Sequence, residues 1–142
     1  MQDMVERRSV DFVSIRVITD DVQRLVYFYE QVTGQQARWA TDDFAELLTP
    51  TCTLAIAHPR TLQLFGADVA WPRANHTAII EFRVDDVDAE YPRLDKLVGE
   101  FVQVPTTMPW GNRSLLFRDP DGNLVNFFTP VSAAARERLN RH

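Results

Sequence analysis

Hydrophobic and polar residues follow one pattern twice along this chain. The segment IRVITDDV at residues 15–22 returns as IEFRVDDV at residues 80–87, so matched positions are 65 residues apart, from 15 to 80 and from 22 to 87. Each copy is a run of β-branched or aromatic residues, then two aspartates, then apolar residues at helical spacing. The repeat predicts two tandem modules, and we expect a functional site first in the cleft between them.

The first copy of the pattern is predicted to fold as a βαβββ unit. Its first strand, at residues 10–18, alternates its side chains and is rich in β-branched residues. Asp20 or Asp21 supplies the N-cap of a helix over residues 21–33, which Gly34 ends. The remaining elements are three short strands near residues 37–39, 44–48 and 53–57, which complete a first module over about residues 10–58.

A linker over residues 59–76 contains Pro59, Gly66 and Pro72, and a helical turn is expected within it at residues 61–66. The second module then repeats the order of the first. Its expected elements are a strand over 78–84, a helix over 86–98 that ends at Gly99, and strands near 100–104, 113–118 and 123–129, within a module over about 77–130. A terminal helix over about 131–140, capped by Ser132, follows.

The DPDGN segment at residues 119–123 separates the last two predicted strands. Its two aspartates invite a catalytic interpretation. Asp, Pro, Gly and Asn are also the residues that a tight hairpin turn requires, because Gly and Asn adopt positive φ. We therefore interpret the segment as a turn.

Composition excludes several classes of protein. The chain has 142 residues, which is the size of one domain, with 45% hydrophobic and 25% charged residues. No apolar run is long enough for a membrane span, and the first residues do not form a signal peptide, so we expect a cytoplasmic protein. The formal charge of −5 argues against nucleic acid as a partner. The single cysteine, Cys52, agrees with a reducing compartment.

Two local motifs extend the repeat to a family resemblance. Phe28-Tyr29 in the first predicted helix is followed by Gly34, and the RDPDGN segment at residues 118–123 runs into an apolar strand. With the doubled βαβββ unit, this chain resembles the glyoxalase I, bleomycin-resistance and extradiol-dioxygenase superfamily, the vicinal oxygen chelate fold. The resemblance implies an α+β fold in which two tandem modules form a curled, cup-shaped mixed sheet with helices on its outer face. It also implies a homodimer, with cups often completed by the partner chain.

In that family, four inward-facing strand positions hold a divalent metal through His, Glu or Gln. The corresponding positions here are Ser14, Ile79, Asn126 and one near Ile56, which form a poor set of metal ligands. We therefore expect no metal and no other cofactor.

A second alignment shifts the ligand set by two residues along each strand. It places Arg16, His58, Glu81 and Phe128 in the ligand positions, and His58 and Glu81 are usual donors. Arg16 opposes this reading because a fixed cation repels a metal ion. His76 is another candidate, although a lone histidine beside a strand is more often a surface residue. A weak metal site near His58 and Glu81 stays open.

Strand alternation predicts which side chains face the cup. We expect Val13, Ile15 and Val17 under the helices, and the candidate ligand-binding residues are Phe12, Ser14, Arg16, Trp39, Phe44, Ile79, Glu81, Trp110, Asn126 and Phe128. The tryptophans and Phe44 would stack on a planar ligand. The repeat makes Arg16 and Glu81 equivalent, so we hypothesise that they pair in the floor of the cup.

These residues favour a small-molecule binding protein of the bleomycin-resistance type, which sequesters an apolar or planar ligand without metal. The alternative is a metal-independent isomerase, lyase or cyclase in which Glu81 is the catalytic acid or base. A metal-dependent lyase or dioxygenase would require an ion near His58 and Glu81. A structural interaction module would fill the cup with its own side chains. We expect neither nucleic acid nor membrane as a partner.

Overall fold

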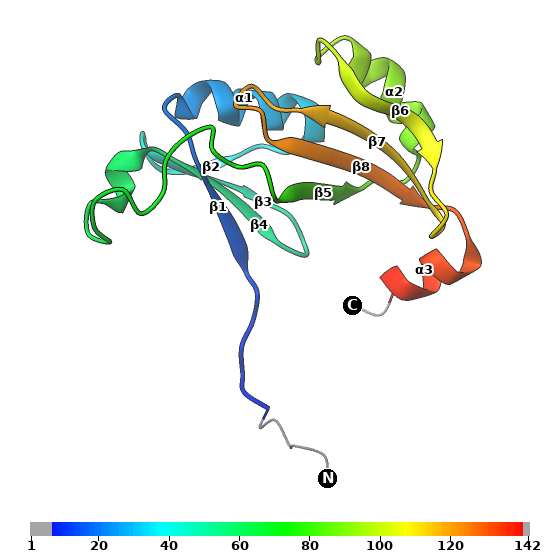
Figure 1. The fold of residues 1–142 in the computed structure, drawn as a ribbon, viewed down its shortest axis with the longest axis horizontal. Coiled ribbons are helices and arrows are strands. Elements are labelled where there is room, and N and C mark those ends of the chain that lie inside the picture. Colours follow the sequence, from blue (N-terminus) through cyan, green and yellow to red (C-terminus); the bar gives the residue numbers. More distant parts are fainter. Residues whose placement is uncertain (1–6, 141–142) are drawn as a thin grey trace.

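The computed structural model of the chain describes residues 7–140. Its elements follow the predicted order twice (Figure 1). The first module consists of β1 (Ser14–Ile18), α1 (Val22–Thr33), β2 (Arg38–Thr41), β3 (Phe44–Leu48) and β4 (Thr53–Ala57). After the 3-10 helix η1 (Pro59–Leu62), the second module consists of β5 (Ile79–Arg83), α2 (Val87–Asp95), β6 (Phe101–Thr107), β7 (Asn112–Arg118) and β8 (Leu124–Pro130), and α3 (Ala133–Leu139) follows. The two tandem βαβββ modules are confirmed.

Each module forms its own four-stranded mixed sheet. The strand orders are β1-β4-β3-β2 and β5-β8-β7-β6, in which β1 pairs in parallel with β4 and β5 with β8. The strands β1 and β5 are therefore edge strands. The predicted first strand is shorter than expected, since β1 begins at Ser14 and Phe12 lies before it with 75% of its surface exposed.

The helix boundaries follow local capping signals. At the start of α1, Asp21 accepts a hydrogen bond from the backbone N–H of Arg24 at 3.1 Å. Gly34 ends the helix with φ of 70°, a left-handed conformation in which only glycine avoids a steric penalty. The second helix ends earlier than predicted, at Asp95, and the chain continues in a tighter turn to Val98.

One hydrophobic core joins the two modules. The buried stripe of α1 is the one that the sequence predicts, namely Val22, Leu25, Val26, Tyr29 and Val32. The same cluster contains Ala45 and Ile56 from the first sheet and Phe117 and Phe127 from the second. The helix-covered faces of both sheets therefore meet in a common interior, and the opposite face of each sheet, its open face, points away from it.

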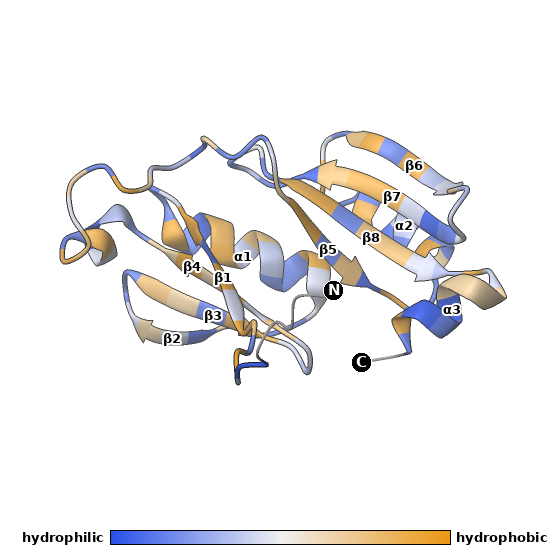
Figure 2. Ribbon diagram, turned by 60° about the horizontal axis from the view of Figure 1, so that its bottom comes forward, coloured by the Kyte–Doolittle hydropathy of each residue, from blue (hydrophilic) through white to orange (hydrophobic). Residues whose placement is uncertain are grey.

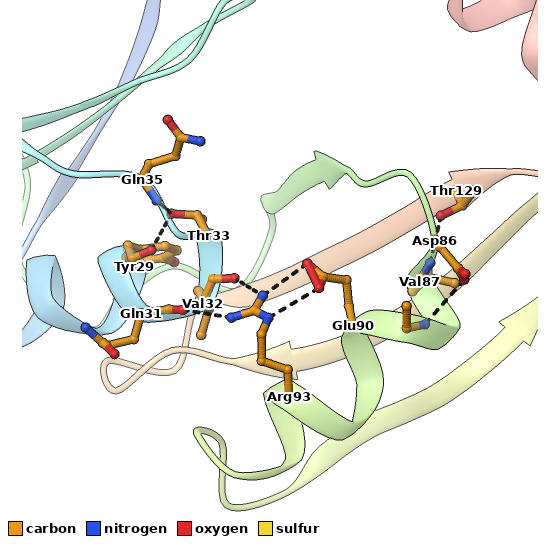
Figure 3. Close-up of polar contacts among 11 residues, drawn as sticks. Tyr29, Gln31, Val32, Thr33, Gln35, Asp86, Val87, Glu90, Arg93 and Thr129 are labelled. Carbon is orange, nitrogen blue, oxygen red and sulfur yellow. Dashed lines mark hydrogen bonds and ion pairs between the residues drawn. The ribbon is translucent and has the colours of Figure 1, made fainter.

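Polar contacts add to this junction. The hydroxyl of Tyr29 donates to Asp119 at 2.7 Å, which links α1 to the β7–β8 turn. Burial, followed by the negative charge of Asp119, raises the pKa of Tyr29 well above its usual value. Arg93 on α2 donates to the backbone oxygens of Gln31 and Val32 at 2.9 and 2.7 Å (Figure 3). These carbonyls lie in the last turn of α1, where helical partners are lacking.

Hydrophobic residues are concentrated along the strands and on α1, with hydrophilic positions interrupting them (Figure 2). Within residues 7–140, no helix has the length and apolar character required to cross a bilayer.

Candidate functional site

The strand registers define which side chains share the open faces. Residues paired across neighbouring strands point to the same face. In the first sheet Arg16 pairs with Ala55, which pairs with Glu46. In the second sheet Glu81 pairs with Asn126. Because Arg16 and Glu81 occupy equivalent positions of the repeat, these two rows correspond to each other.

The neighbouring rows complete both open faces. The first sheet presents Ser14, Arg16, Ile18, Arg38, Phe44, Glu46, Leu48, Thr53, Ala55 and Ala57. The second presents Ile79, Glu81, Arg83, Ser114, Leu116, Arg118, Leu124, Asn126 and Phe128. Most of the predicted cup residues therefore share the open faces.

Two residues that we expected at the cup lie on the helix-covered side. Ile56 pairs with Val17 and Ala45 in the core and is 1% exposed, so the cup position on β4 is Ala55. Trp39 also pairs with Ala45. A shift of one residue in a strand moves its side chain to the other face, and the register of β2 is irregular between Trp39 and Thr41.

Arg16 contacts two aromatic rings on the open face of the first sheet. Its guanidinium carbon is 5.0 Å from the ring centroid of Phe44 and 5.8 Å from that of Phe65 in the linker. The small side chains of Ala55 and Ala57 leave space for this arrangement. Phe65 could not be predicted from the sequence, because a residue in an irregular linker belongs to no periodic pattern.

Glu81 has a partner other than the predicted one. Its carboxylate accepts a hydrogen bond from the side-chain amide of Asn126 at 2.9 Å. Among residues 7–140, no ion pair joins Arg16 to Glu81, so the hypothesis of a pair within one chain is wrong.

Asn126 has an unused acceptor. It is 8% exposed, and its Oδ1 atom is buried without a hydrogen-bond partner within the described part of the chain. A buried amide oxygen of this kind is costly unless a further donor reaches it. Together, Glu81 and Asn126 form a polar pair whose hydrogen bonding the single chain leaves incomplete.

The predicted residue Trp110, and the linker residue Trp71, lie apart from these rows. Trp110 is 58% exposed in the turn before β7, and its backbone oxygen accepts a hydrogen bond from Arg138 near the C-terminus. Leu116, which pairs with Asn126, is four residues from Asn112, the first residue of β7. This separation is about 13 Å along a strand, and the turn of Trp110 lies still farther from the row of Asn126. Trp71 is 62% exposed in the linker, where a hollow of about 410 Å³ lies between Pro59 and Trp71.

Neither candidate histidine lies in a cluster of metal donors. The Nδ1 atom of His58 accepts a hydrogen bond from the backbone N–H of Arg60 at 3.0 Å, so His58 caps η1. His76 borders a smaller hollow of about 170 Å³ on the second sheet, together with Ile79, Arg118 and Leu124.

The donor set of the open faces does not fit the metal centre that the fold family implies. Within residues 7–140, no three His, Cys, Asp or Glu side chains lie close enough to hold an ion together. The central rows offer two carboxylates, Glu81 and Glu46, and the amide of Asn126. Glu46 is already in an ion pair with Arg38, and the cation of Arg16 occupies the position equivalent to Glu81. A site of three or four strong donors cannot be built from these groups.

The profile of the Glyoxalase/Bleomycin resistance protein/Dioxygenase superfamily matches residues 11–127. The chain belongs to this superfamily. The protein YraH of Bacillus subtilis, described as uncharacterized, is 25% identical to this superfamily member over 128 residues, which cover 82% of this chain and 95% of YraH.

Solved structures of the superfamily share the fold. A glyoxalase/bleomycin resistance protein/dioxygenase family enzyme from Burkholderia phytofirmans superposes with a TM-score of 0.75 at 19% identity, covering 86% of this chain and 100% of that one. A glyoxalase/bleomycin resistance protein/dioxygenase from Nocardioides gives a TM-score of 0.72 at 21% identity, covering 92% of this chain and 88% of that one. At these identities the likeness establishes the fold alone.

Proposed function

We propose that this superfamily member binds and sequesters a small, largely apolar molecule in a cup formed by its open sheet faces. The observation that carries the proposal is the composition of these faces. Aliphatic and aromatic side chains, among them Ile79, Leu124, Phe44 and Phe128, surround a few polar groups in the central rows. Apolar walls with a small number of oriented polar groups are typical of ligand sites.

We also propose that binding does not depend on a metal. The strong donors of the central rows are the carboxylates of Glu81 and Glu46. Glu81 already accepts from Asn126, and Glu46 forms an ion pair with Arg38. His58 uses its Nδ1 atom to cap η1. Affinity in this proposal comes from burial of apolar surface, and orientation comes from hydrogen bonds to Arg16, Glu81 and Asn126.

The third part of the proposal is a homodimer that completes the cup. The common core holds the helix-covered faces together, so the open faces of one chain point away from it. The edge strands β1 and β5 pair with β4 and β8 alone, and Ile15 and Ile79 on them are 43% and 49% exposed. Val13 was expected under the helices but is 66% exposed. Exposed apolar edges favour pairing with a second copy.

Ligand and second copy are the only partners in this proposal, and the location that we propose is the cytoplasm. The charge of −5 opposes binding to nucleic acid. Cys52 is a free thiol exposed in the turn between β3 and β4, which suits a reducing compartment.

Metal analysis and a ligand screen on the same purified sample test the proposal. We expect less than one transition-metal ion per two chains, and a set of planar apolar compounds that raise the melting temperature equally with and without EDTA. A ligand at 100 times its Kd stabilises a protein by about 2.7 kcal/mol, which such a screen resolves. A stoichiometric metal whose removal abolishes binding would refute the metal-free site.

The homodimer is tested by light scattering coupled to gel filtration. Ile15→Lys places a charge on the exposed edge of β1, and we expect it to shift the wild-type dimer to a monomer. Tyr27→Lys is the matched control, since Tyr27 is 64% exposed on α1 and belongs to neither edge strand. A wild-type protein that elutes as a monomer at all concentrations contradicts the proposed assembly.

The exposure of Glu81 and its single hydrogen bond favour a second candidate function. The Glu81 side chain is exposed and accepts one hydrogen bond, from Asn126, so a ligand can reach its carboxylate. In this case the protein is a metal-independent isomerase, lyase or cyclase, with Glu81 as the acid or base. Glu81→Gln distinguishes the two functions, because it abolishes turnover of a bound compound while leaving its binding intact. Recovery of every screened ligand unchanged, by mass spectrometry, favours sequestration.

A further inference from the structure

The open sheet faces differ in charge from the chain as a whole. The strand rows of the two faces carry four arginines and two glutamates, which gives a formal charge of +2, whereas the chain carries −5. These residues are Arg16, Arg38, Arg83, Arg118, Glu46 and Glu81. A positive surface within an acidic protein attracts anions and raises their local concentration.

The arginines of these faces are paired to different degrees. Arg38 forms an ion pair with Glu46 at 2.9 Å, and Arg118 donates to the backbone oxygen of Gly122. By contrast, Arg16 and Arg83 make no hydrogen bond or ion pair through their guanidinium groups within the part of the chain that the structure describes. Their donors are therefore available to a ligand.

Arg16 has the geometry of an anion receptor. The rings of Phe44 and Phe65 lie beside its guanidinium, at 5.0 and 5.8 Å from the guanidinium carbon, and restrict its position. Neither ring accepts a conventional hydrogen bond, so the N–H groups remain free for a planar acceptor with two oxygens. A guanidinium binds a carboxylate through two parallel hydrogen bonds, which a lysine cannot do.

We propose that the ligand of this site is an organic acid whose carboxylate binds Arg16 and whose planar body lies against Phe44 and Phe65. This inference rests on the proposed small-molecule function and adds the chemical class of the ligand. Glutamates on the same faces could neutralise the arginines, and Glu81 occupies the repeat position equivalent to Arg16. The cations exceed the glutamates by two on these faces, so a positive surplus persists when each glutamate neutralises one arginine.

The test compares an acid with its neutral amide. Binding of 1-naphthoate and of 1-naphthamide to the full chain is measured by isothermal titration calorimetry, for the wild type and three variants. Wild type is expected to bind the acid more tightly than the amide. Arg16→Gln should weaken the acid about 10- to 100-fold and the amide less than about twofold, since a charge-assisted hydrogen bond contributes about 1.5–3 kcal/mol.

Two further variants separate charge from packing. Phe65→Ala should weaken the acid and the amide alike, because it removes a ring from the wall of the site and keeps the charge of Arg16. Arg24→Gln removes an exposed arginine of α1 outside the open faces and should change neither affinity. Raising the salt concentration should weaken the acid and not the amide.

Each alternative result is decisive. Equal affinity for acid and amide, or an Arg16→Gln variant that retains the preference for the acid, overturns the inference while the proposed binding function stands. If neither compound binds and no compound of the wider screen does, the inference and the proposed function both fall. If the wider screen yields ligands that are all neutral, only the anionic class is rejected.

Discussion

The second module contains two carboxylate–asparagine pairs that differ in how completely they are satisfied. Asp119 accepts four hydrogen bonds, from the Tyr29 hydroxyl, the Asn123 side chain and the backbone N–H groups of Asp121 and Asn123. Glu81 accepts one, from Asn126, whose own Oδ1 lacks a partner within the described residues. The first pair holds the modules together, and the second leaves hydrogen-bonding capacity for something outside the chain.

The arginines repeat this contrast. Arg93 at the junction donates four hydrogen bonds, two to backbone oxygens of α1 and two to Glu90. The guanidinium of Arg16 on the open face donates none within residues 7–140 and contacts two aromatic rings instead. The same residue types therefore serve stability where they are fully paired and remain free for binding where they are not.

The largest expected loss of stability follows from replacing Asp119, the carboxylate with four hydrogen bonds. Asp119→Ala leaves the Tyr29 hydroxyl, the Asn123 amide and two backbone N–H groups without their acceptor. The site is buried, since Asp119 is 5% exposed. We expect it to lower the free energy of unfolding by about 3 to 4 kcal/mol. Glu81→Ala, at an exposed site, should stay within about 0.5 kcal/mol of the wild type. Urea unfolding measures both, and equal losses would show that the two pairs have the same role.

The two arginines give the next largest difference. Arg93→Ala removes hydrogen bonds to the end of α1 from a partly exposed side chain, so we expect a loss of about 2 kcal/mol. Arg16→Ala should change stability by about 0.5 kcal/mol or less, since it removes contacts with two rings at an exposed site. The comparison fails if Arg16→Ala proves to be the more destabilising change in thermal unfolding.

Tyr29→Phe tests the hydrogen bond between Tyr29 and Asp119 through the dependence of stability on pH. Removal of its hydroxyl should lower stability at pH 7 by about 1 kcal/mol. Burial and Asp119 raise the pKa of Tyr29 in the folded chain, so the unfolded chain releases this proton first. The wild type should therefore keep its full stability below about pH 10 and lose it more steeply than Tyr29→Phe above that pH, until the folded pKa is reached. Parallel urea midpoints of both proteins between pH 9 and 11 would contradict the shift.

Local signals account for the parts of the fold that the sequence predicted. The strands at 44–48 and 53–57 have the predicted bounds, and Asp21, Gly34 and Ser132 act as the expected helix caps. Each of these features depends on a few neighbouring residues. The RDPDGN turn also lies where it was predicted. The hydrogen bond from Tyr29 to Asp119, 90 residues away, could not be predicted from local residues.

The predictions that failed depend on distant or irregular parts of the chain. The faces of Trp39 and Ile56 were misassigned because a turn or an irregular register changes strand parity, which alternation within one strand does not reveal. The contact of Phe65 with Arg16 comes from the linker. The absence of an Arg16–Glu81 pair follows from the common core, which fixes how the modules pack and leaves β1 and β5 as separate edges.

The smallest expected change in stability comes from replacing Asn126, and it distinguishes this residue from Asn123. Asn126→Leu replaces an amide whose oxygen lacks a partner with an apolar side chain of similar branching, so it should leave stability within about 0.5 kcal/mol of the wild type or raise it slightly. Asn123→Leu removes a donor to Asp119 and should destabilise the protein by about 2 kcal/mol. A stable Asn126→Leu variant that has lost ligand binding would mean that the amide is retained for the ligand at the expense of stability. A loss of 2 kcal/mol or more at Asn126 would instead assign it to the fold, together with Asn123.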